Sequence, residues 1–339
     1  MRLMTILHVS DLHFGPVDPS TFDARAPRLW AKWKHFDGLL GHSYKSLVRL
    51  EQIYRRLKAN ENAQLLISGD LTTVGGQDEF ATAHDYLGGL LIPPKGEYLG
   101  LQDHAWRDLC VPGNHDHWSG QPVIWGGPTA HFNSYFNYTP RQTFWQLNNG
   151  FRLSFLSIDT DSDVSPYGSS RVLARGDFQS HLRRLAAMLG VPPADKREIR
   201  VLILHHSYTA QGKTLVMNSA SKAALHDFIV DHDISVLLCG HIHQPPSATV
   251  VQASHLKQTV QFLEARSGTT TQISSLPYDW TNLLGHRPDR GDHWPNTLLV
   301  HRILFDGGAL DWQIELLAER PSGFEPFATD WKPFRLWPR

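Results

Sequence analysis

Cysteine is nearly absent from this chain of 339 residues, which holds only Cys110 and Cys239. Two thiols are too few for the disulfide framework that stabilises many small secreted proteins. Each of them ends an apolar run typical of a strand, which favours a buried free thiol in both cases. Both also lie next to the polar motifs described below, so a role as a metal ligand stays open for each.

Long apolar runs are missing as well. No segment approaches the roughly 18 uninterrupted apolar residues that a transmembrane helix needs. The first ten residues are too short and too interrupted to form the apolar core of a signal peptide, and no small-residue cleavage site follows them. The sequence therefore predicts a cytoplasmic protein without a membrane span.

An excess of charge is also lacking, because 32 Lys and Arg residues face 33 Asp and Glu residues, for a net charge of −1. This balance gives no general attraction to nucleic acid or to an anionic membrane. The sequence shows no interdomain linker and no feature that indicates an oligomeric state. We expect a single domain over residues 1–320, with irregular insertions at about 15–41 and 118–149. A C-terminal tail would follow at 321–339.

Apolar stretches with strand and helix periodicity alternate along the chain. A first strand is expected at residues 3–10, and a helix with one apolar face at 44–57, capped by Ser43. The further strands are expected at 64–68, 106–111, 151–159, 199–204, 234–239, 259–265, 297–305 and 309–317, and the further helices at 77–91, 177–189 and 219–231. Such alternation predicts an α/β fold with parallel strands and right-handed crossovers.

The stretch Val111-Pro-Gly-Asn-His-Asp-His117 delivers three kinds of polar side chain at the end of an apolar run. Proline cannot continue a strand ladder, and glycine tolerates the tight turn that follows. The turn then presents an amide oxygen (Asn114), an imidazole (His115) and a carboxylate (Asp116). Turns favour Asn, Asp and Gly for structural reasons, so this stretch alone is ambiguous. Its place at a strand end is where open α/β sheets carry their active sites.

Five expected strand ends carry metal-ligand side chains. These residues are Asp11, His13, Asp70, Asn114, His205, His241 and His243. Carboxylate, amide oxygen and imidazole suit Mn, Fe and Zn, and the lack of a thiolate among them argues against a structural zinc site. Seven ligands are more than one metal usually takes from a protein. One carboxylate can bridge two cations ~3.5–4 Å apart, the arrangement that hydrolyses phosphate esters.

These motifs, in this order, resemble those of the calcineurin-like metallophosphoesterase family. The matching pieces are Asp11-Leu-His13, Gly69-Asp70, Gly113-Asn-His-Asp116, the strand-terminal His205 and Gly240-His-Ile-His243. They span residues 11–243, which is most of the chain. The resemblance implies an α/β fold, namely a four-layer α/β/β/α sandwich of two mixed sheets with a dimetal site at the C-terminal ends of the strands. The β-rich segment after residue 247 would complete the second sheet.

The resemblance also implies a role for each site residue. It assigns one metal to Asp11, His13, Asp70 and His243, and the other to Asp70, Asn114, His205 and His241. Two cations bridged by Asp70 would neutralise the phosphate and generate a bridging hydroxide that attacks in line with the leaving alkoxide. His115 resembles the histidine beside the metals that contacts the phosphate or protonates the leaving oxygen. Asp116 would orient and charge-stabilise that imidazole.

The match to the family is loosest around His205-His206, because Ser207-Tyr208 follows where many relatives have proline. We expect His205 to be the ligand, with His206 as the alternative. Aromatic and arginine side chains in loops are commonly structural. Some loop side chains close to the motifs are nevertheless candidates for substrate contact: His117, Trp118, Arg175 and Tyr208.

The sequence thus predicts a metal-dependent phosphoric ester hydrolase that holds two ions of Mn, Fe or Zn. We expect a small or nucleotide-like phosphate ester as its substrate, because the charge balance reveals no basic stripe, and we favour a phosphodiester over a phosphomonoester. A nuclease of the same family is the alternative, and it would need a basic channel beside the metals. A non-catalytic metal-binding scaffold ranks last, since such relatives are expected to lose ligands that this chain retains.

Overall fold

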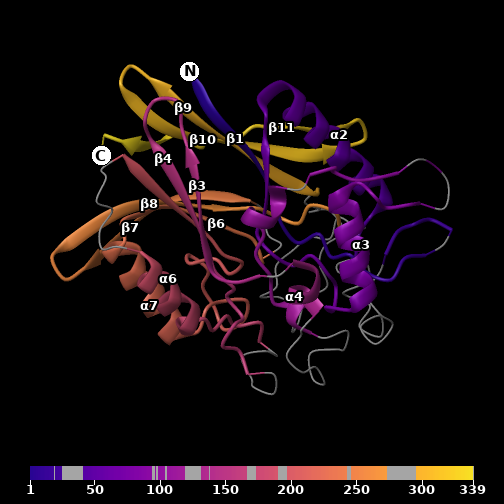
Figure 1. Ribbon diagram of the computed structural model, residues 1–339, viewed down its shortest axis with the longest axis horizontal. Helices are drawn as coiled ribbons and strands as arrows, with labels where there is room; N and C mark the ends of the chain where they lie inside the picture. Colours follow the sequence, from indigo (N-terminus) through magenta and orange to yellow (C-terminus); the bar gives the residue numbers. More distant parts are fainter. Residues whose placement is uncertain are drawn as a thin grey trace.

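The first of two sheets contains the first and the last strand of the chain. The computed structural model describes residues 1–18, 20–24, 41–93, 96, 98–103, 105–118, 131–136, 138–165, 173–189, 197–242, 246–272 and 295–338. The strands of this sheet are β1 (Arg2–Val9), β2 (Gln64–Ile67), β9 (Thr297–Asp306), β10 (Ala309–Arg320), β11 (Gly323–Phe327) and β12 (Phe334–Trp337). Their order is β11-β10-β9-β1-β2, and β12 also pairs with β10 (Figure 1).

The second sheet has the order β3-β4-β5-β6-β8-β7. Its strands are β3 (Arg141–Gln146), β4 (Arg152–Ser157), β5 (Glu198–Ile203), β6 (Ile234–Cys239), β7 (Ser247–His255) and β8 (Gln258–Arg266). The main helices are α2 (Tyr44–Glu61), α3 (Gln77–Gly88), α4 (His131–Phe136), α6 (Gln179–Met188) and α7 (Ser219–Asp231). Helices α2 and α3 lie on one side of the two sheets, and α6 and α7 lie on the other (Figure 1). The predicted α/β sandwich of two mixed sheets is confirmed.

The central strands β5 and β6 of the second sheet are buried at every position because both of their faces are covered. In β5, Val201 and Ile203 belong to the core that lies between the sheets. The intervening Leu202 and the following Leu204 belong to the core under α6 and α7. Successive side chains of a strand point to opposite faces, and here each face packs against a core. The residues from Val201 to Leu204 are therefore all apolar. In the part of the chain that the structure describes, no helix is both long and apolar enough to cross a membrane.

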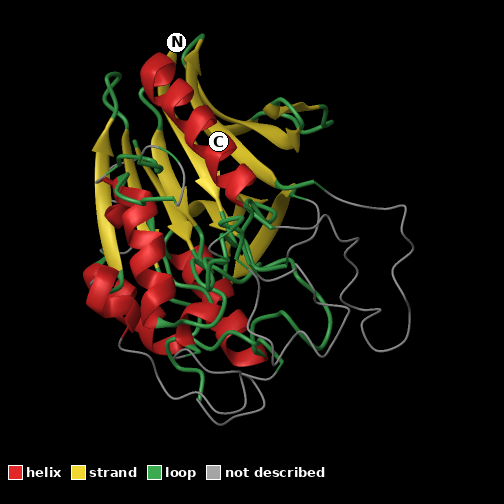
Figure 2. Ribbon diagram, turned by 90° about the vertical axis from the view of Figure 1, so that its right-hand side faces the viewer, coloured by secondary structure: helices red, strands yellow, loops and turns green. Residues whose placement is uncertain are grey.

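The parallel strands bring their carboxyl ends to one edge of the molecule. β1 is parallel to β2 in the first sheet, and β4, β5, β6 and β8 are parallel in the second. Loops gather beyond this end of the strands, where the two sheets meet (Figure 2). The side chains that follow β1, β2, β5 and β6 are therefore delivered to a common place.

Four segments differ from the sequence prediction. The strand expected at 106–111 is a 3-10 helix (η2, Ala105–Leu109) followed by one bridge from Cys110 to Ile67. Charged residues interrupt its apolar run, which leaves too little for a strand. The stretch 118–149, expected to be irregular, contains α4 and β3. The expected tail after 320 carries β11 and β12, and the β-rich segment after 247 divides between the two sheets.

A line of buried side chains crosses the first sheet through Ser68, His8, His301 and Trp312. Trp312 Nε1 donates to His301 Nδ1 at 2.9 Å, so the hydrogen of a neutral His301 is on Nε2. That nitrogen lies 3.2 Å from His8 Nδ1, which places the His8 hydrogen on Nε2, 2.9 Å from Ser68 Oγ. In each ring the nitrogen without a hydrogen, Nδ1, already accepts a hydrogen bond. An additional proton on Nδ1 of either histidine would therefore face a donor hydrogen. Burial lowers the pKa of His8 to about 3 and that of His301 well below its usual value.

Acid is expected to destabilise the fold through this histidine pair. Because the folded-state pKa is below the unfolded value of 6.5, the unfolded chain binds more protons, and stability present above that pH is lost as the pH falls. For His8 alone, the loss between about pH 7.5 and about pH 5 is about 2 kcal/mol. Urea unfolding of the wild type and of His8→Gln measures it. The free energy of unfolding of the variant should depend less on pH by this amount. The same pH dependence of that free energy in both proteins would contradict a neutral histidine pair.

Candidate metal centre

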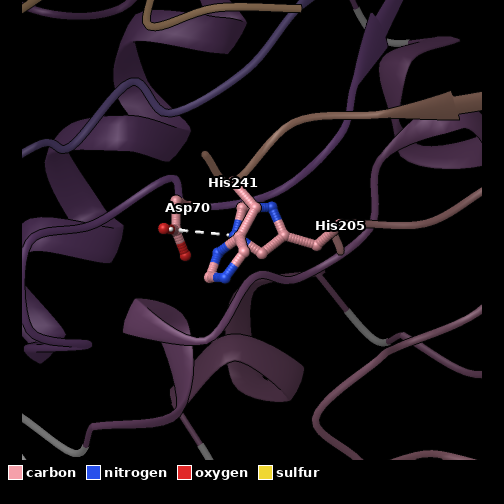
Figure 3. A group of neighbouring side chains, drawn as sticks. All are labelled: Asp70, His205 and His241. Carbon is pink, nitrogen blue, oxygen red and sulfur yellow. Dashed lines mark hydrogen bonds and ion pairs between the residues drawn. The ribbon is translucent and has the colours of Figure 1, made fainter. Parts of the chain in front are cut away.

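Two groups of ligand side chains share the carboxylate of Asp70. Asp11, His13 and Asp70 form one group, and Asp70, His205 and His241 form the other. Within each group the oxygen and nitrogen atoms that could bind a metal lie within 4.8 Å of one another, and all five side chains are buried. Figure 3 shows the two imidazoles of the second group beside Asp70. Residues that the sequence placed on four strand ends thus meet at one site.

Four of these five residues have a left-handed backbone. The φ angles are 53° at Asp11, 47° at His13, 53° at Asp70 and 78° at His241. Residues with a Cβ rarely adopt this region, which costs on the order of 1–3 kcal/mol for each. The chain turns sharply as each strand ends, and the turns hold one another, since Asp11 N donates to Gly69 O at 3.0 Å and His13 N donates to Asp70 O at 3.1 Å. This backbone strain is concentrated where the ligand side chains converge.

Gly113 lets the Asn114 turn approach Asp70. A Cβ at position 113 would lie 2.2 Å from Asp70 Oδ1 and 2.4 Å from Asp70 N, so no other residue fits without a shift. The close approach allows His115 N to donate to Asp70 Oδ1 at 2.9 Å. It also brings Asn114 Oδ1 to 3.3 Å from His205 Nε2. Asn114 therefore lies beside the second ligand group, as its position in the sequence predicts.

Backbone carbonyls hold the Nδ1 atom of three histidines at the site. The pairs are His13 with Thr72 O (3.2 Å), His115 with Thr73 O (2.7 Å) and His205 with Ser68 O (2.7 Å). A carbonyl can only accept a hydrogen bond, so each Nδ1 carries a hydrogen. Each ring therefore presents Nε2 as the atom that can bind a metal or exchange a proton.

The site combines negative and positive charge in a buried place. Burial alone would raise the pKa of Asp70, but His205, His115 and His13 hold it well below its usual value. Burial would lower the pKa of His205, whereas Asp70, with Oδ2 3.2 Å from His205 Nε2, raises it to about 10. An ionised carboxylate that is surrounded by imidazole nitrogens and an amide oxygen is a donor set that Mn, Fe and Zn accept. The residues therefore fit a metal.

Asp116 is fully buried beside the turn that carries Asn114 and His115. Its oxygens accept hydrogen bonds from the amides of Leu71 (3.2 Å), Thr72 (2.9 Å) and Gly113 (2.9 Å) and from the Thr72 hydroxyl (2.8 Å). Four donors match the roughly four lone-pair sites of a carboxylate. The hydrogen bond that holds the His115 ring is donated by its Nδ1 to Thr73 O. Asp116 thus holds the loop that carries this carbonyl, and its expected role in orienting and charge-stabilising His115 stays a prediction.

A family model described as calcineurin-like phosphoesterase matches residues 4–245 of the chain. The chain belongs to this family. The matched region includes all seven residues that the sequence assigns to the metals, and the resemblance inferred from the motifs is confirmed. Membership among the calcineurin-like phosphoesterases implies metal-dependent hydrolysis of phosphate esters.

No curated protein matches the chain. A solved structure to which this calcineurin-like phosphoesterase is similar is the crystal structure of Chaetomium thermophilum Vps29. The two share 12% sequence identity with a TM-score of 0.31, and the alignment covers 99% of this chain and 96% of that chain. A likeness of this extent has no bearing on the activity.

The choice between His205 and His206 follows from what their rings contact. His206 Nδ1 lies 2.8 Å from Thr160 Oγ1, and its Nε2 lies 3.2 Å from Ala174 O. Both nitrogens of His206 are therefore engaged by other elements, whereas His205 Nε2 faces Asp70. This geometry favours His205 as the ligand of the phosphoesterase site. His243, the seventh expected ligand, lies outside the described residues.

The two thiols of this calcineurin-like phosphoesterase are buried and protonated. Cys110 and Cys239 are both free cysteines, and their side chains lie in the core. Burial raises the pKa of each thiol well above its usual value. A thiolate is the form that binds metals, so these environments argue against the ligand role that the sequence left open.

Two candidates for substrate contact lie at the site. The Trp118 ring packs on the His115 imidazole, with centroids 3.8 Å apart. His117 Nε2 lies 3.0 Å from Asp159 Oδ2. Burial would lower the pKa of His117, but Asp159 raises it to about 9, which places a cation beside the metal centre. Asp159 was missed from the sequence, although it follows β4 at the same sheet edge as the ligand residues.

The other two candidates are engaged elsewhere. The hydroxyl of Tyr208 lies 2.8 Å from His226 Nδ1, and its ring packs against Phe262. Arg175 Nε donates to the carbonyl of Lys213 at 2.7 Å. These contacts fit the structural reading of both side chains, in which they stabilise the loops around the site.

Proposed function

We propose that this calcineurin-like phosphoesterase is a dimetal-dependent phosphodiesterase that acts on small or nucleotide-like phosphate esters. The observation that supports this most strongly is the pair of buried ligand groups that share Asp70, with the His115 imidazole next to them. One shared carboxylate between two ligand groups is the arrangement that a two-metal phosphoesterase requires.

We assign the ligands as the family pattern suggests. One metal would be held by Asp11, His13, Asp70 and His243, and the other by Asp70, Asn114, His205 and His241. Mn, Fe and Zn all suit this mixture of oxygen and nitrogen ligands. When bound, the metal pair supplies charge neutralisation on the phosphate and activation of water.

His115 is positioned to manage the proton of the leaving group. Its Nδ1 hydrogen is held by Thr73 O, so Nε2 faces the site, 3.9 Å from Asp70 Oδ2. The Trp118 ring covers one face of the imidazole and restricts its rotation. A protonated Nε2 can donate to the leaving oxygen as the P–O bond breaks, which is general acid catalysis.

For the substrate, we favour a diester with one negative charge over a phosphomonoester. The side chains that hold down the pKa of Asp70 are the histidines His205, His115 and His13. A phosphomonoester brings about two negative charges near neutral pH. His117 adds one cation at the side of the site, but Asp159 balances it. The net charge of −1 supports a small substrate over a polyanion.

A comparison of two chromogenic esters tests the proposal. Protein reconstituted with manganese should hydrolyse an aryl phosphodiester faster than the matching phosphomonoester. A chelator should abolish the activity, and manganese should restore it. A monoester preference would replace the diesterase by a phosphatase. Bound metal without turnover of either ester or of natural nucleotides would favour the scaffold.

A nuclease of the same family is the second candidate. It predicts binding to DNA or RNA that weakens steeply as salt rises, because bound phosphates release counterions. Titration of the protein with a labelled single strand and with a labelled duplex, each at two salt concentrations, decides between the nuclease and the small-molecule phosphodiesterase. Absence of salt-sensitive binding would remove the nuclease.

A further inference from the structure

The loop that orients His115 is held by hydrogen bonds from all of its amides. Each N–H from residue 71 to residue 76 has an acceptor in a buried or half-buried place. The acceptors are Asp116 for Leu71 and Thr72, Phe14 O for Thr73, Glu79 for Val74 and Gly76, and the Thr72 hydroxyl for Gly75. Two carboxylates, Asp116 and Glu79, thus define the path of this loop. Such complete pairing restricts the carbonyls that point the other way.

Glu79 lies in the first turn of α3 and is 4% exposed. One oxygen accepts from Val74 N at 2.9 Å and from Gly76 N at 3.1 Å, and the other accepts from the Thr73 hydroxyl. The bond to Gly76 is half of an ordinary capping box, which would stabilise the helix and nothing else. The bonds to Thr73 and Val74 go beyond a cap, because they hold the residue whose carbonyl meets His115.

Thr73 is fixed through three of its groups at once. Its amide donates to Phe14 O at 2.9 Å, its hydroxyl donates to Glu79, and its carbonyl accepts from His115 Nδ1 at 2.7 Å. Of these three bonds, the bond to Glu79 is the one that the Thr73 side chain makes. A shift of Thr73 by a fraction of an ångström would lengthen the bond to His115 and release its ring.

We propose that Glu79 is a positioning residue for His115, and that it acts through Thr73. It holds the carbonyl that fixes the His115 ring, so that Nε2 carries the exchangeable proton at the site. This inference deepens the proposed function, since its kinetic consequence rests on His115 as the general acid. Its structural consequence, the state of the His115 ring, does not depend on any activity.

Two variants separate positioning from helix capping. Thr73→Val removes the hydroxyl that binds Glu79, keeps the β-branched shape and leaves the Gly76 capping bond intact. Glu79→Gln keeps the size of the side chain but sets an NH2 group against donors. The matched control is Glu51→Gln, since Glu51 is also a buried helical carboxylate, in contact with Arg55 on α2.

The first measurement is the ring state of His115 in the metal-free protein. Long-range ¹H–¹⁵N correlation spectra distinguish the two neutral tautomers, and the His115→Ala spectrum assigns the signal. We expect the Nδ1–H form in the wild type and in Glu51→Gln, and a mixture with the Nε2–H form in Thr73→Val and Glu79→Gln. An unchanged His115 signal in both variants would overturn the proposal, whether or not the protein hydrolyses any ester.

The second measurement compares diesters with a good aryl and a poor alkyl leaving group. In both variants kcat for the alkyl ester should fall by about 10-fold or more, since a poor leaving group needs the general acid. The aryl ester and the metal content should change little. An equal loss on both esters, or a loss in Glu79→Gln alone, would indicate capping and overturn the proposal. If the wild type hydrolysed neither ester, the proposed function would fail while the spectra still decided the role of Glu79.

Discussion

Asp70→Asn is expected to remove both metal ions and to lower turnover of the preferred ester by about 10³-fold or more, which corresponds to about 4 kcal/mol of transition-state stabilisation. Asp70 is the residue that the two ligand groups share, so one substitution affects both. An amide has the shape of the carboxylate but no charge to bridge two cations. It would also leave His205, whose pKa Asp70 raises to about 10, without its counter-charge. Metal content by mass spectrometry and kcat/KM for the ester measure the two effects.

Asp103→Asn is the matched control for this experiment. Asp103 is a buried aspartate that contacts the Tyr54 hydroxyl and lies 3.8 Å from Lys58, on the side of α2. It should alter stability but leave the metal content and the activity per folded molecule unchanged. Retention of both metals by Asp70→Asn would contradict the shared-ligand assignment, and full activity with both metals would contradict the proposed mechanism.

His115→Gln is expected to lower kcat by about 10²- to 10⁴-fold on an alkyl diester, with both metals retained. The side chain of His115 lies outside both ligand groups, so its loss should not release metal. Glutamine fills similar space, and its amide cannot transfer a proton. Burial of the neighbouring Trp118 against the ring means that some structural change will accompany the substitution.

The leaving group separates the chemical effect of His115→Gln from this structural change. An aryl leaving group departs without protonation, so its turnover should fall much less than that of the alkyl ester. A loss of equal size on both esters would indicate that His115 contacts the phosphate instead of protonating the leaving oxygen. Loss of metal in the variant would place His115 among the ligands and contradict the geometry.

Several residues of the site could be predicted because they follow strands. Asp11, Asp70, His205 and His241 each come after an apolar run of strand length, and the ends of parallel strands meet at one edge however the loops fold. The family motifs then ordered them into one site. The same reasoning failed at 106–111, where an apolar run with internal charges forms a 3-10 helix. It also missed β3, an edge strand whose sequence Arg-Gln-Thr-Phe-Trp-Gln is too polar to stand out.

Other features depend on backbone groups and could not be predicted. Every residue has a carbonyl, so no sequence pattern marks Thr73 as the acceptor for His115 or Ser68 as the acceptor for His205. Glu79 could be recognised from the sequence only as a helix-capping residue, because its bond to Thr73 depends on how the loop folds back.

By itself, the sequence determined the family, the α/β class and the order of ligand residues along the chain. The class depends on the period of apolar residues, and the family was recognised from the resemblance of the ordered motifs at the strand ends. Only the tertiary structure decided that Asp70 is shared, that His205 faces it in place of His206, and which ring nitrogens point into the site. These depend on segments far apart in the chain, as in the bond from His241 N to Asp11 Oδ2, which joins residues 230 positions apart. The left-handed turns and carbonyl acceptors that set such distances leave no trace in side-chain pattern.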